Sequence, residues 1–339
     1  MTAPDLSAEL IKLVNGFRVS QAIHVAATLG IADLLKEGAR SSNDLAAATN
    51  SHPGTLYRLL RALAAAGLFH EHGDKSFSVS PLGECLYSDA EQPVEPYATF
   101  VGRPHQWQAW GALLHSVRTG ENAYLHVHGV SLWEYLTEHP EEARLFNRGM
   151  TGNSQGLAEA ITAAYDFSAF GRVVDVGGGQ GAILARILAA HGTMRGILFD
   201  QPDVVAQAGP ILEAAGVADR CDMAGGNFFE TVPMGGDAYI LKRILHDFDD
   251  VASLAILKVC RQVIRPDGKL LIMERIVAPP NEGLETKISD LNMLVSPGGQ
   301  ERTADEFAAL LATAAFRLNR IVEVNSLLSV VEAAPTHMP

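Results

Sequence analysis

The 339-residue sequence has few cysteines and no long apolar run. Its cysteines, Cys85, Cys221 and Cys260, are three in number and far apart, which excludes a secreted disulfide framework and indicates a reducing compartment. Because no apolar stretch reaches about 18 residues, no membrane-spanning helix is expected. The first residues contain neither a basic leader nor a continuous apolar segment, so no secretion signal is expected. We therefore expect a cytoplasmic protein without membrane partners.

Basic residues are also scarce. Lysine and arginine number 26 against 39 aspartates and glutamates, which gives a formal net charge of −13. A protein this acidic repels polyphosphate, so nucleic acid is not an expected partner. Hydrophobic residues make up 47% of the chain and charged residues 19%, the composition of a globular protein with a full core. At roughly 150 residues per domain, the length predicts two domains.

Residues 1–97 follow the pattern of a winged helix. Leucines recur at intervals of three and four residues, which predicts a helix with one apolar face; they are Leu56, Leu59, Leu60 and Leu63. A short alternating strand and a Pro-Leu-Gly turn follow at residues 77–83. Such a domain can bind DNA, but the first 100 residues carry seven basic and eleven acidic side chains, without the electropositive face that phosphate contacts need. The pattern therefore favours a dimerisation domain over a DNA-binding regulator.

Residues 98–339 combine a helical connector, residues 98–165, with an α/β core from residue 166 onward. The strands expected first in this core are Arg172–Val176 and residues 196–199, 238–241 and 269–273. Their alternation with helices predicts a parallel sheet covered on both faces. Two last strands, at residues 318–324 and 327–331, have two residues between them and must form an antiparallel hairpin.

A glycine-rich turn follows the first of these strands. Residues 177–181 read Gly-Gly-Gly-Gln-Gly and lead directly into a helix, which lets a ligand approach the backbone beside a helix N-terminus. Asp200 ends the next strand, where an acidic acceptor suits ribose hydroxyls. The turn also satisfies the dinucleotide fingerprint of nicotinamide enzymes. The C-terminal hairpin favours S-adenosylmethionine instead, because an all-parallel dinucleotide fold does not end in this way.

One histidine and two glutamates follow sheet strands or a tight turn. His246 lies just after the strand at residues 238–241, Glu274 follows the strand at 269–273, and Glu301 follows a Ser-Pro-Gly-Gly-Gln turn. Open α/β folds place their active sites at the carboxyl ends of the strands. An imidazole held by two carboxylates can accept a proton. From spacing alone, a capping histidine beside two solvated glutamates is an equally good interpretation.

Four motifs occur in a fixed order, at residues 146–150 (FNRGM), 174–179 (VDVGGG), 241–247 (LKRILHD) and 297–303 (PGGQERT). Together they resemble the cation-independent small-molecule O-methyltransferases, which include plant caffeate-type enzymes, hydroxyindole O-methyltransferase and bacterial natural-product tailoring enzymes. The resemblance covers nearly the whole chain. It implies a Rossmann-like class I methyltransferase sheet with a C-terminal antiparallel hairpin, in which one reversed strand lies at the edge of the sheet. An α-helical winged-helix domain that forms a homodimer precedes this sheet.

Site residues follow from the resemblance by position. It implies that His246 is the catalytic base and that Glu274 and Glu301 orient it. The residues implied to contact S-adenosylmethionine are Gly177, Asp200, Asn227, Phe228 and Lys242. The family usually has aspartate where this chain has Asn227, which retains an acceptor without the charge. The residues implied to line the pocket of the methyl acceptor are Phe146, Met150, Asn153, Asn292 and Met293.

The function implied is transfer of a methyl group from S-adenosylmethionine to a hydroxyl of a small aromatic substrate, with S-adenosylhomocysteine as product. No metal is expected, because His126 and His128 lie in a Gly-flanked segment without a third ligand. Two alternatives stay open. Proteins of this fold can use bound S-adenosylmethionine for hydroxylation or decarboxylation of an aromatic polyketide, and a winged helix can belong to a regulator.

Overall fold

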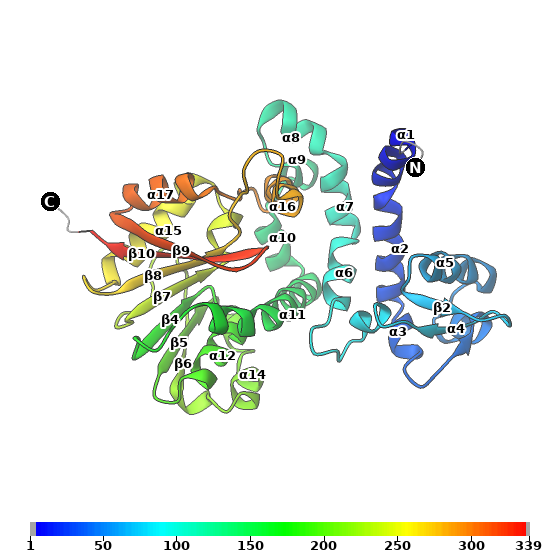
Figure 1. The fold of residues 1–339 in the computed structure, drawn as a ribbon, viewed down its shortest axis with the longest axis horizontal. Coiled ribbons are helices and arrows are strands. Elements are labelled where there is room, and N and C mark those ends of the chain that lie inside the picture. Colours follow the sequence, from blue (N-terminus) through cyan, green and yellow to red (C-terminus); the bar gives the residue numbers. More distant parts are fainter. Residues whose placement is uncertain (1–4, 337–339) are drawn as a thin grey trace. The chain divides into compact units, whose positions relative to one another are not determined.

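The structure, a computed structural model, describes residues 5–336, without the side chains of residues 152–156. The chain forms two compact units (Figure 1). The first contains the chain up to Trp107 together with His139–Asn153, and the second contains Gln108–Glu138 and the chain from Ser154 onward. The expected domain boundary after residue 97 stays a prediction. In the structure, helix α6 (Glu95–Val101) spans this boundary and belongs to the first unit.

The first unit consists of helices and a small antiparallel sheet with the strand order β1-β3-β2. The apolar face predicted for α5 is buried at Leu56, Leu60 and Leu63, because a period of 3.6 residues places these leucines on one side of the helix. The elements of this unit that precede residue 104 are α1 (Leu6–Val14), α2 (Gly16–Thr28), α3 (Ile31–Leu34), β1 (Arg40–Ser41), α4 (Ser42–Ala48), α5 (Pro53–Ala65), β2 (Phe69–Glu71), β3 (Ser76–Val79), η1 (Gly83–Leu86) and α6 (Glu95–Val101).

Helix α1 presents apolar side chains that the first unit does not bury. None of its residues is buried, and Leu10 and Leu13 are 61% and 75% exposed. Phe17, near the start of α2, is also exposed. Exposed apolar helix faces of this kind are typical of a surface that binds another protein chain.

The second unit contains most of the chain's regular structure. Two helices include residues of both units, α7 (Pro104–Gly111) and α11 (Pro140–Ala164). The other elements are α8 (Leu113–Thr119), α9 (Ala123–His128), α10 (Leu132–Glu138), β4 (Arg172–Val176), α12 (Ala182–Ala190), β5 (Arg195–Asp200), α13 (Pro202–Val205), α14 (Gly209–Ala214), η2 (Ala218–Arg220), β6 (Cys221–Gly225), β7 (Ala238–Lys242), η3 (Leu245–Asp247), α15 (Asp250–Val263), β8 (Lys269–Glu274), α16 (Leu284–Val295), α17 (Ala304–Thr313), β9 (Phe316–Asn325) and β10 (Leu328–Pro335).

A seven-stranded sheet with the order β6-β5-β4-β7-β8-β10-β9 forms the centre of this unit. Strands β4 to β8 pair in parallel, and β10 is antiparallel to both β8 and β9. The class I methyltransferase fold with its C-terminal hairpin is therefore confirmed. The expectation that the reversed strand lies at the edge is wrong: β10 lies between β8 and β9, because the hairpin inserts its second strand beside β8.

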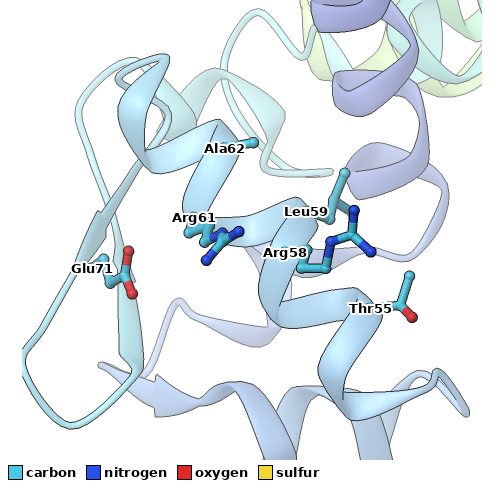
Figure 2. A pocket seen from close by; sticks show the side chains of 6 residues that line it. All are labelled: Thr55, Arg58, Leu59, Arg61, Ala62 and Glu71. Carbon is cyan, nitrogen blue, oxygen red and sulfur yellow. The ribbon is translucent and has the colours of Figure 1, made fainter.

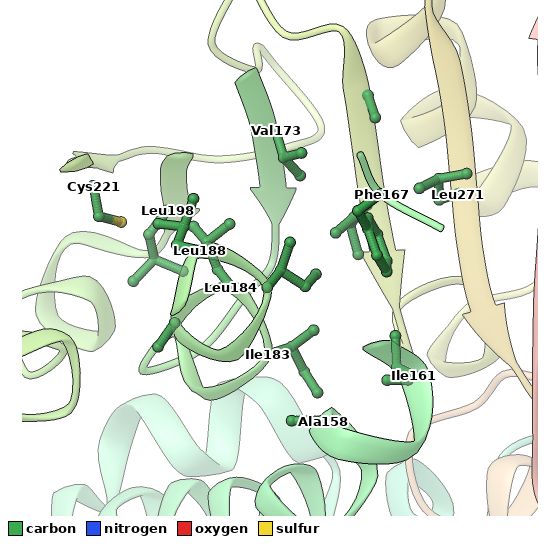
Figure 3. Packing of buried hydrophobic residues seen from close by; sticks show 14 of the residues in the cluster. Ala158, Ile161, Phe167, Val173, Ile183, Leu184, Leu188, Leu198, Cys221 and Leu271 are labelled. Atoms are coloured by element: carbon green, nitrogen blue, oxygen red, sulfur yellow. The ribbon is translucent and has the colours of Figure 1, made fainter. Parts of the chain in front are cut away.

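Apolar side chains cover both faces of this sheet. On one face, residues of α11, α12 and α14 pack against the strands, among them Ile161 and Leu184, which lie in one cluster with Leu198 of β5 (Figure 3). On the other face, residues of α15 and α17 do so, among them Leu257 and Phe307. Strand β6 is absent from the sequence prediction because it is short, interrupted by Asp222 and largely exposed at the sheet edge, so it lacks the apolar run of the other parallel strands.

Candidate active site

The glycine-rich turn connects β4 to α12 at the carboxyl ends of the parallel strands. Gly177, Gly179 and Gly181 have φ angles of 68°, 60° and 82°, which glycine adopts without strain. A Cβ on Gly178 would lie 2.5 Å from Cδ1 of Leu198, whereas the space around a Cβ on Gly179 is open to 4 Å. The turn therefore packs tightly against the sheet and leaves one backbone segment open to a ligand.

Asp200 ends β5 and holds this turn. Its Oδ2 accepts a hydrogen bond from the N–H of Gly179 at 2.8 Å, and its Oδ1 accepts one from the N–H of Gln201 at 2.7 Å. Burial raises the pKa of Asp200, and the two hydrogen bonds oppose that rise. Each carboxylate oxygen can accept more than one hydrogen bond. Asp200 can therefore also accept one from a ligand hydroxyl.

Asp175 is a second carboxylate beside the turn, and the sequence reasoning did not single it out. Its side chain is buried on β4, and neither carboxylate oxygen has a hydrogen-bond partner among the described residues. Burial raises the pKa of Asp175 to about 7, against the attraction of Lys242 at the end of β7. Burial in turn lowers the pKa of Lys242 to about 7. The signal in the sequence was an aspartate inside an otherwise apolar strand.

Asn227 and Phe228 follow β6. The ring of Phe228 is half-buried beside the glycine turn, where a Cβ on Gly177 would lie 3.6 Å from its Cε1. The Asn227 amide is exposed, and it accepts a hydrogen bond from the N–H of Phe229 at 3.0 Å and donates one to Glu230 at 3.2 Å. Phe228 thus presents an apolar ring at this side of the turn, and the ligand contact of Asn227 stays a prediction.

His246 lies in η3, directly after β7, with a side chain that is 12% exposed. Its Nδ1 is 3.2 Å from Oε1 of Glu301, which also accepts a hydrogen bond from the hydroxyl of Ser289 at 2.7 Å. Because a carboxylate accepts hydrogen bonds, we assign the ring proton to Nδ1, and Nε2 is then the basic nitrogen. The structure therefore brings together two residues that the sequence separates by 55 positions.

Glu274, at the end of β8, contacts the backbone of this turn. Its Oε1 accepts hydrogen bonds from the N–H groups of Ile244 and His246, at 3.2 and 3.1 Å. Burial raises the pKa of Glu274 to about 7. Glu274 thus holds the main chain on which His246 stands, and its action on the imidazole ring itself stays a prediction.

Asp247 places another carboxylate beside the imidazole, which the sequence reasoning missed. Its Oδ1 is 3.5 Å from Nε2 of His246. Burial raises the pKa of Asp247 to about 6, and His246 opposes that rise. Burial would lower the pKa of His246, but Asp247 and Glu301 outweigh it, so this pKa lies above its ordinary value. The surroundings of the ring therefore favour uptake of a proton.

The turn that carries His246 is held by the segment that contains Glu301. A Cβ on Gly299 would lie 2.1 Å from the carbonyl oxygen of His246, so a larger residue does not fit there. Arg302 is buried and donates hydrogen bonds to the carbonyl oxygens of Leu245 and Phe248, both at 3.0 Å. These contacts on either side of His246 hold the main chain that carries the imidazole.

Two of the predicted substrate contacts, Asn292 and Met293, lie on α16 in the second unit. Asn292 accepts a hydrogen bond from Nε1 of Trp110 at 3.0 Å, and Met293 is buried. One turn earlier on the same helix, Ser289 contacts Glu301.

The other predicted substrate contacts belong to the first unit. Phe146 and Met150 lie on α11, where the ring of Phe146 packs edge-on against Phe100 with centroids 5.3 Å apart. The side chain of Asn153 lies outside the described residues. Substrate contacts by these residues stay predictions.

We found no second candidate site in the described part of the chain among possible metal-binding clusters or in the hollow beside α5. Among residues 5–336, no group of three or more His, Cys, Asp or Glu side chains could hold a metal ion; the ring of His126 stacks on His115 instead. None of the described helices is long and apolar enough to cross a membrane. An open hollow beside α5 is lined by Thr55, Arg58, Leu59, Arg61, Ala62 and Glu71 (Figure 2), without a buried acid–base pair.

Known protein families match most of the chain. The O-methyltransferase domain matches residues 110–317, and the O-methyltransferase dimerisation domain matches residues 11–89. The chain belongs to the O-methyltransferase family. The predicted resemblance to S-adenosylmethionine-dependent O-methyltransferases is thereby confirmed, and the dimerisation domain supports a homodimer.

Individual relatives span nearly the same length. The phenazine O-methyltransferase of Lysobacter antibioticus is 44% identical over 98% of this chain and 97% of its own. The mitomycin biosynthesis 6-O-methyltransferase of Streptomyces lavendulae is 41% identical, over 91% of this chain and 88% of its own. The O-methyltransferase NcsB1 from neocarzinostatin biosynthesis, solved with S-adenosylmethionine and 2-hydroxy-5-methyl naphthoic acid, has a TM-score of 0.81 at 32% identity, over 94% of this chain and 96% of its own.

Proposed function

We propose that this protein transfers the methyl group of S-adenosylmethionine to a hydroxyl of a small aromatic acceptor, with His246 as the general base. The observation that carries the proposal is the buried imidazole of His246, with Nδ1 at 3.2 Å from Glu301 and Nε2 left as the basic nitrogen. The relatives support the acceptor class, since one methylates a phenazine and another was solved with a hydroxynaphthoic acid.

The residues around the glycine turn fit S-adenosylmethionine. Asp175 has two buried oxygens without a hydrogen-bond partner among the described residues, which suits the cationic amino group of the cofactor. Asp200 suits the ribose hydroxyls, and Phe228 offers an apolar face to the adenine. Gly177, Asn227 and Lys242 complete the proposed cofactor contacts. The cofactor supplies, when bound, a methyl group on a sulfonium, which needs no metal for activation.

A phenol hydroxyl of the acceptor is a weaker acid than the imidazolium form of His246, so transfer of its proton to His246 is unfavourable. A phenol with a pKa near 10 and an imidazole near 6.5 differ by about 3.5 units, so complete proton transfer before attack would cost about 5 kcal/mol. The raised pKa of His246 narrows this difference. Removal of the proton by Nε2 during the attack lowers the requirement further, because Glu301 stabilises the imidazolium through Nδ1. An aliphatic hydroxyl is far less acidic, which favours an aromatic acceptor.

The two alternatives have less support. Hydroxylation or decarboxylation with bound S-adenosylmethionine does not need a base held in this way, whereas methyl transfer to a hydroxyl does. A winged-helix regulator does not fit the acidic first 100 residues or the match to a dimerisation domain. We also propose that the protein acts in the cytoplasm and binds neither nucleic acid nor membranes.

Exchange of His246 for alanine tests the proposal. The wild type is incubated with methyl-labelled S-adenosylmethionine and a panel of phenols, and S-adenosylhomocysteine must accumulate only when an acceptor is present. His246→Ala should lower the rate by about 10²–10⁴-fold, because it removes the base. Its affinity for S-adenosylhomocysteine should stay close to that of the wild type. The matched control is His70→Ala, which changes an exposed histidine of the first unit. Equal turnover by His246→Ala would refute the role of the base.

A further inference from the structure

The hydroxyl of Ser289 lies against the carboxylate that contacts the proposed base. Ser289 is a half-buried residue of α16, and its Oγ donates a hydrogen bond at 2.7 Å to Oε1 of Glu301. The same oxygen is 3.2 Å from Nδ1 of His246. The other oxygen, Oε2, is buried and has no hydrogen-bond partner among the described residues. One oxygen of Glu301 therefore accepts from two donors at once.

Helix α16 holds Glu301 at two points. Asp290, the residue after Ser289, accepts at Oδ1 a hydrogen bond from the backbone N–H of Glu301 at 2.9 Å. Consecutive residues of the helix thus fix the main chain and the side chain of Glu301. Because this side chain is fully buried, bulk water does not supply another donor in place of the Ser289 hydroxyl.

The hydroxyl of Ser289 changes how strongly Glu301 attracts a proton. Burial would raise the pKa of Glu301, but His246 and the Ser289 hydroxyl outweigh it, so this pKa lies below its ordinary value. A hydrogen bond to a carboxylate stabilises the anion and makes it less basic. A less basic carboxylate attracts the proton of an imidazolium at Nδ1 less strongly. Ser289 therefore opposes the rise in the pKa of His246 that Glu301 causes.

Several charged groups surround His246 and Glu301, and none of them depends on this hydroxyl. In the described part of the chain, Ser289 forms no hydrogen bond with any of them. Removal of the Ser289 hydroxyl therefore leaves their charges and contacts in place. These groups are Asp247 in η3, Glu274 at the end of β8, Arg275 directly after β8, Asp290 on α16 and Arg302 next to Glu301.

We propose that Ser289 is a positioning residue for the base: its hydroxyl holds the Glu301 carboxylate toward Nδ1 of His246 and weakens the attraction of this carboxylate for the imidazolium proton. The ring is thereby kept in one tautomer, and it still returns to the neutral form that a base needs near neutral pH. This inference rests on the proposed function and adds to it a residue that does not itself exchange a proton with the acceptor.

Exchange of Ser289 for alanine tests this role by two measurements. The pKa of His246 is measured in the free full-length protein by NMR of isotope-labelled histidine, with His246→Ala to identify the signal. The pH dependence of kcat/KM is measured with the best phenol of the panel. In Ser289→Ala, the pKa and the low-pH limb should both rise by about 0.5–1 unit, the effect of one hydrogen bond. Below the limb, kcat/KM should fall about 3- to 10-fold, and on the plateau it should stay similar.

Two further variants separate this effect from a merely structural one. Ser289→Thr keeps a hydroxyl at the same position and should restore the wild-type limb. Ser253→Ala is the matched control, because it removes a buried hydroxyl that donates to the carbonyl oxygen of Leu245 on the same turn. Ser253 does not contact Glu301, so the limb should stay in place even if this variant unfolds at a lower temperature.

The outcomes distinguish this inference from the proposed function. An unchanged or lower pKa of His246 in folded Ser289→Ala would overturn the role of Ser289. If this variant does not fold, Ser289→Cys takes its place, because a thiol is a weaker donor, and an unchanged pKa in that variant would have the same meaning. A raised pKa together with full turnover by His246→Ala would support the action of Ser289 on the imidazole and refute His246 as the base.

Discussion

Replacement of Glu301 by glutamine tests how a buried carboxylate acts on His246. The Glu301 side chain is fully buried, with Oε1 at 3.2 Å from Nδ1 of the imidazole. Glutamine has the same shape and can still accept this hydrogen bond, so the variant removes the charge and little else. Hydrogen bonds to charged groups contribute about 1.5–3 kcal/mol and neutral ones about 0.5–1.5 kcal/mol, so the expected loss is about 1–2 kcal/mol.

This loss changes both the pKa of His246 and the rate. One pKa unit corresponds to about 1.36 kcal/mol, so the pKa of His246 should fall by about one unit in Glu301→Gln. His246 must be neutral to accept a proton, and the low-pH limb of kcat/KM should therefore move to lower pH by about one unit. On the plateau, a weaker stabilisation of the imidazolium should lower kcat/KM by about 5- to 30-fold.

The assay is the rate of S-adenosylhomocysteine formation as a function of pH, with the best phenol of the panel. Glu306→Gln is the matched control, because Glu306 caps α17 and is exposed to solvent. Thermal unfolding of both variants shows whether the fold is retained. A low-pH limb at the wild-type position in a folded Glu301→Gln variant would refute the assigned interaction between this carboxylate and the imidazole.

Three further changes address other parts of the molecule. Burial raises the pKa of Asp175 to about 7, so binding of the cationic amino group of S-adenosylhomocysteine at pH 6 should release a proton from this carboxyl, and the affinity should rise as the pH rises toward 7. Calorimetry in buffers of different ionisation enthalpy detects the released proton. An equal release by Asp175→Asn would contradict this assignment. Gly299→Ala places a Cβ at 2.1 Å from the His246 carbonyl oxygen, and the shift of the turn should lower kcat at least tenfold while cofactor affinity, measured by titration, stays similar; an unchanged kcat would show that the turn tolerates the methyl group. Leu10→Glu puts a charge on the exposed face of α1 and should convert the homodimer to monomers in sedimentation experiments, and a persistent dimer would place the interface elsewhere.

Local patterns in the sequence were sufficient for much of the fold. The apolar run of β4, followed by glycines, predicted both the strand and the turn, because a buried parallel strand and a positive φ angle each demand particular residue types. The two residues between the last strands predicted an antiparallel hairpin, because no parallel crossover is that short. The short edge strand β6 escaped this reasoning, since a partly exposed strand need not be apolar.

The candidate site was predictable in its members and unpredictable in its contacts. His246, Glu274 and Glu301 were identified at strand ends and after a turn, but their spacing did not indicate that Glu301 contacts the ring and Glu274 the backbone. Asp247 and Asp175 were missed. The local sequence of Asp247 does not show that its carboxylate lies beside Nε2 of His246. The local sequence of Asp175 does not show that its carboxylate has no hydrogen-bond partner among the described residues.

The sequence by itself determined the family, the type of sheet and the residues available for chemistry, because these follow from residue type and spacing along the chain. Only the tertiary structure decided which side chains meet. The contacts of His246 with Glu301 and of Asn292 with Trp110 join residues that are 55 and 182 positions apart. Such pairs depend on how the strands and helices pack in three dimensions, and local sequence patterns carry no information about that packing.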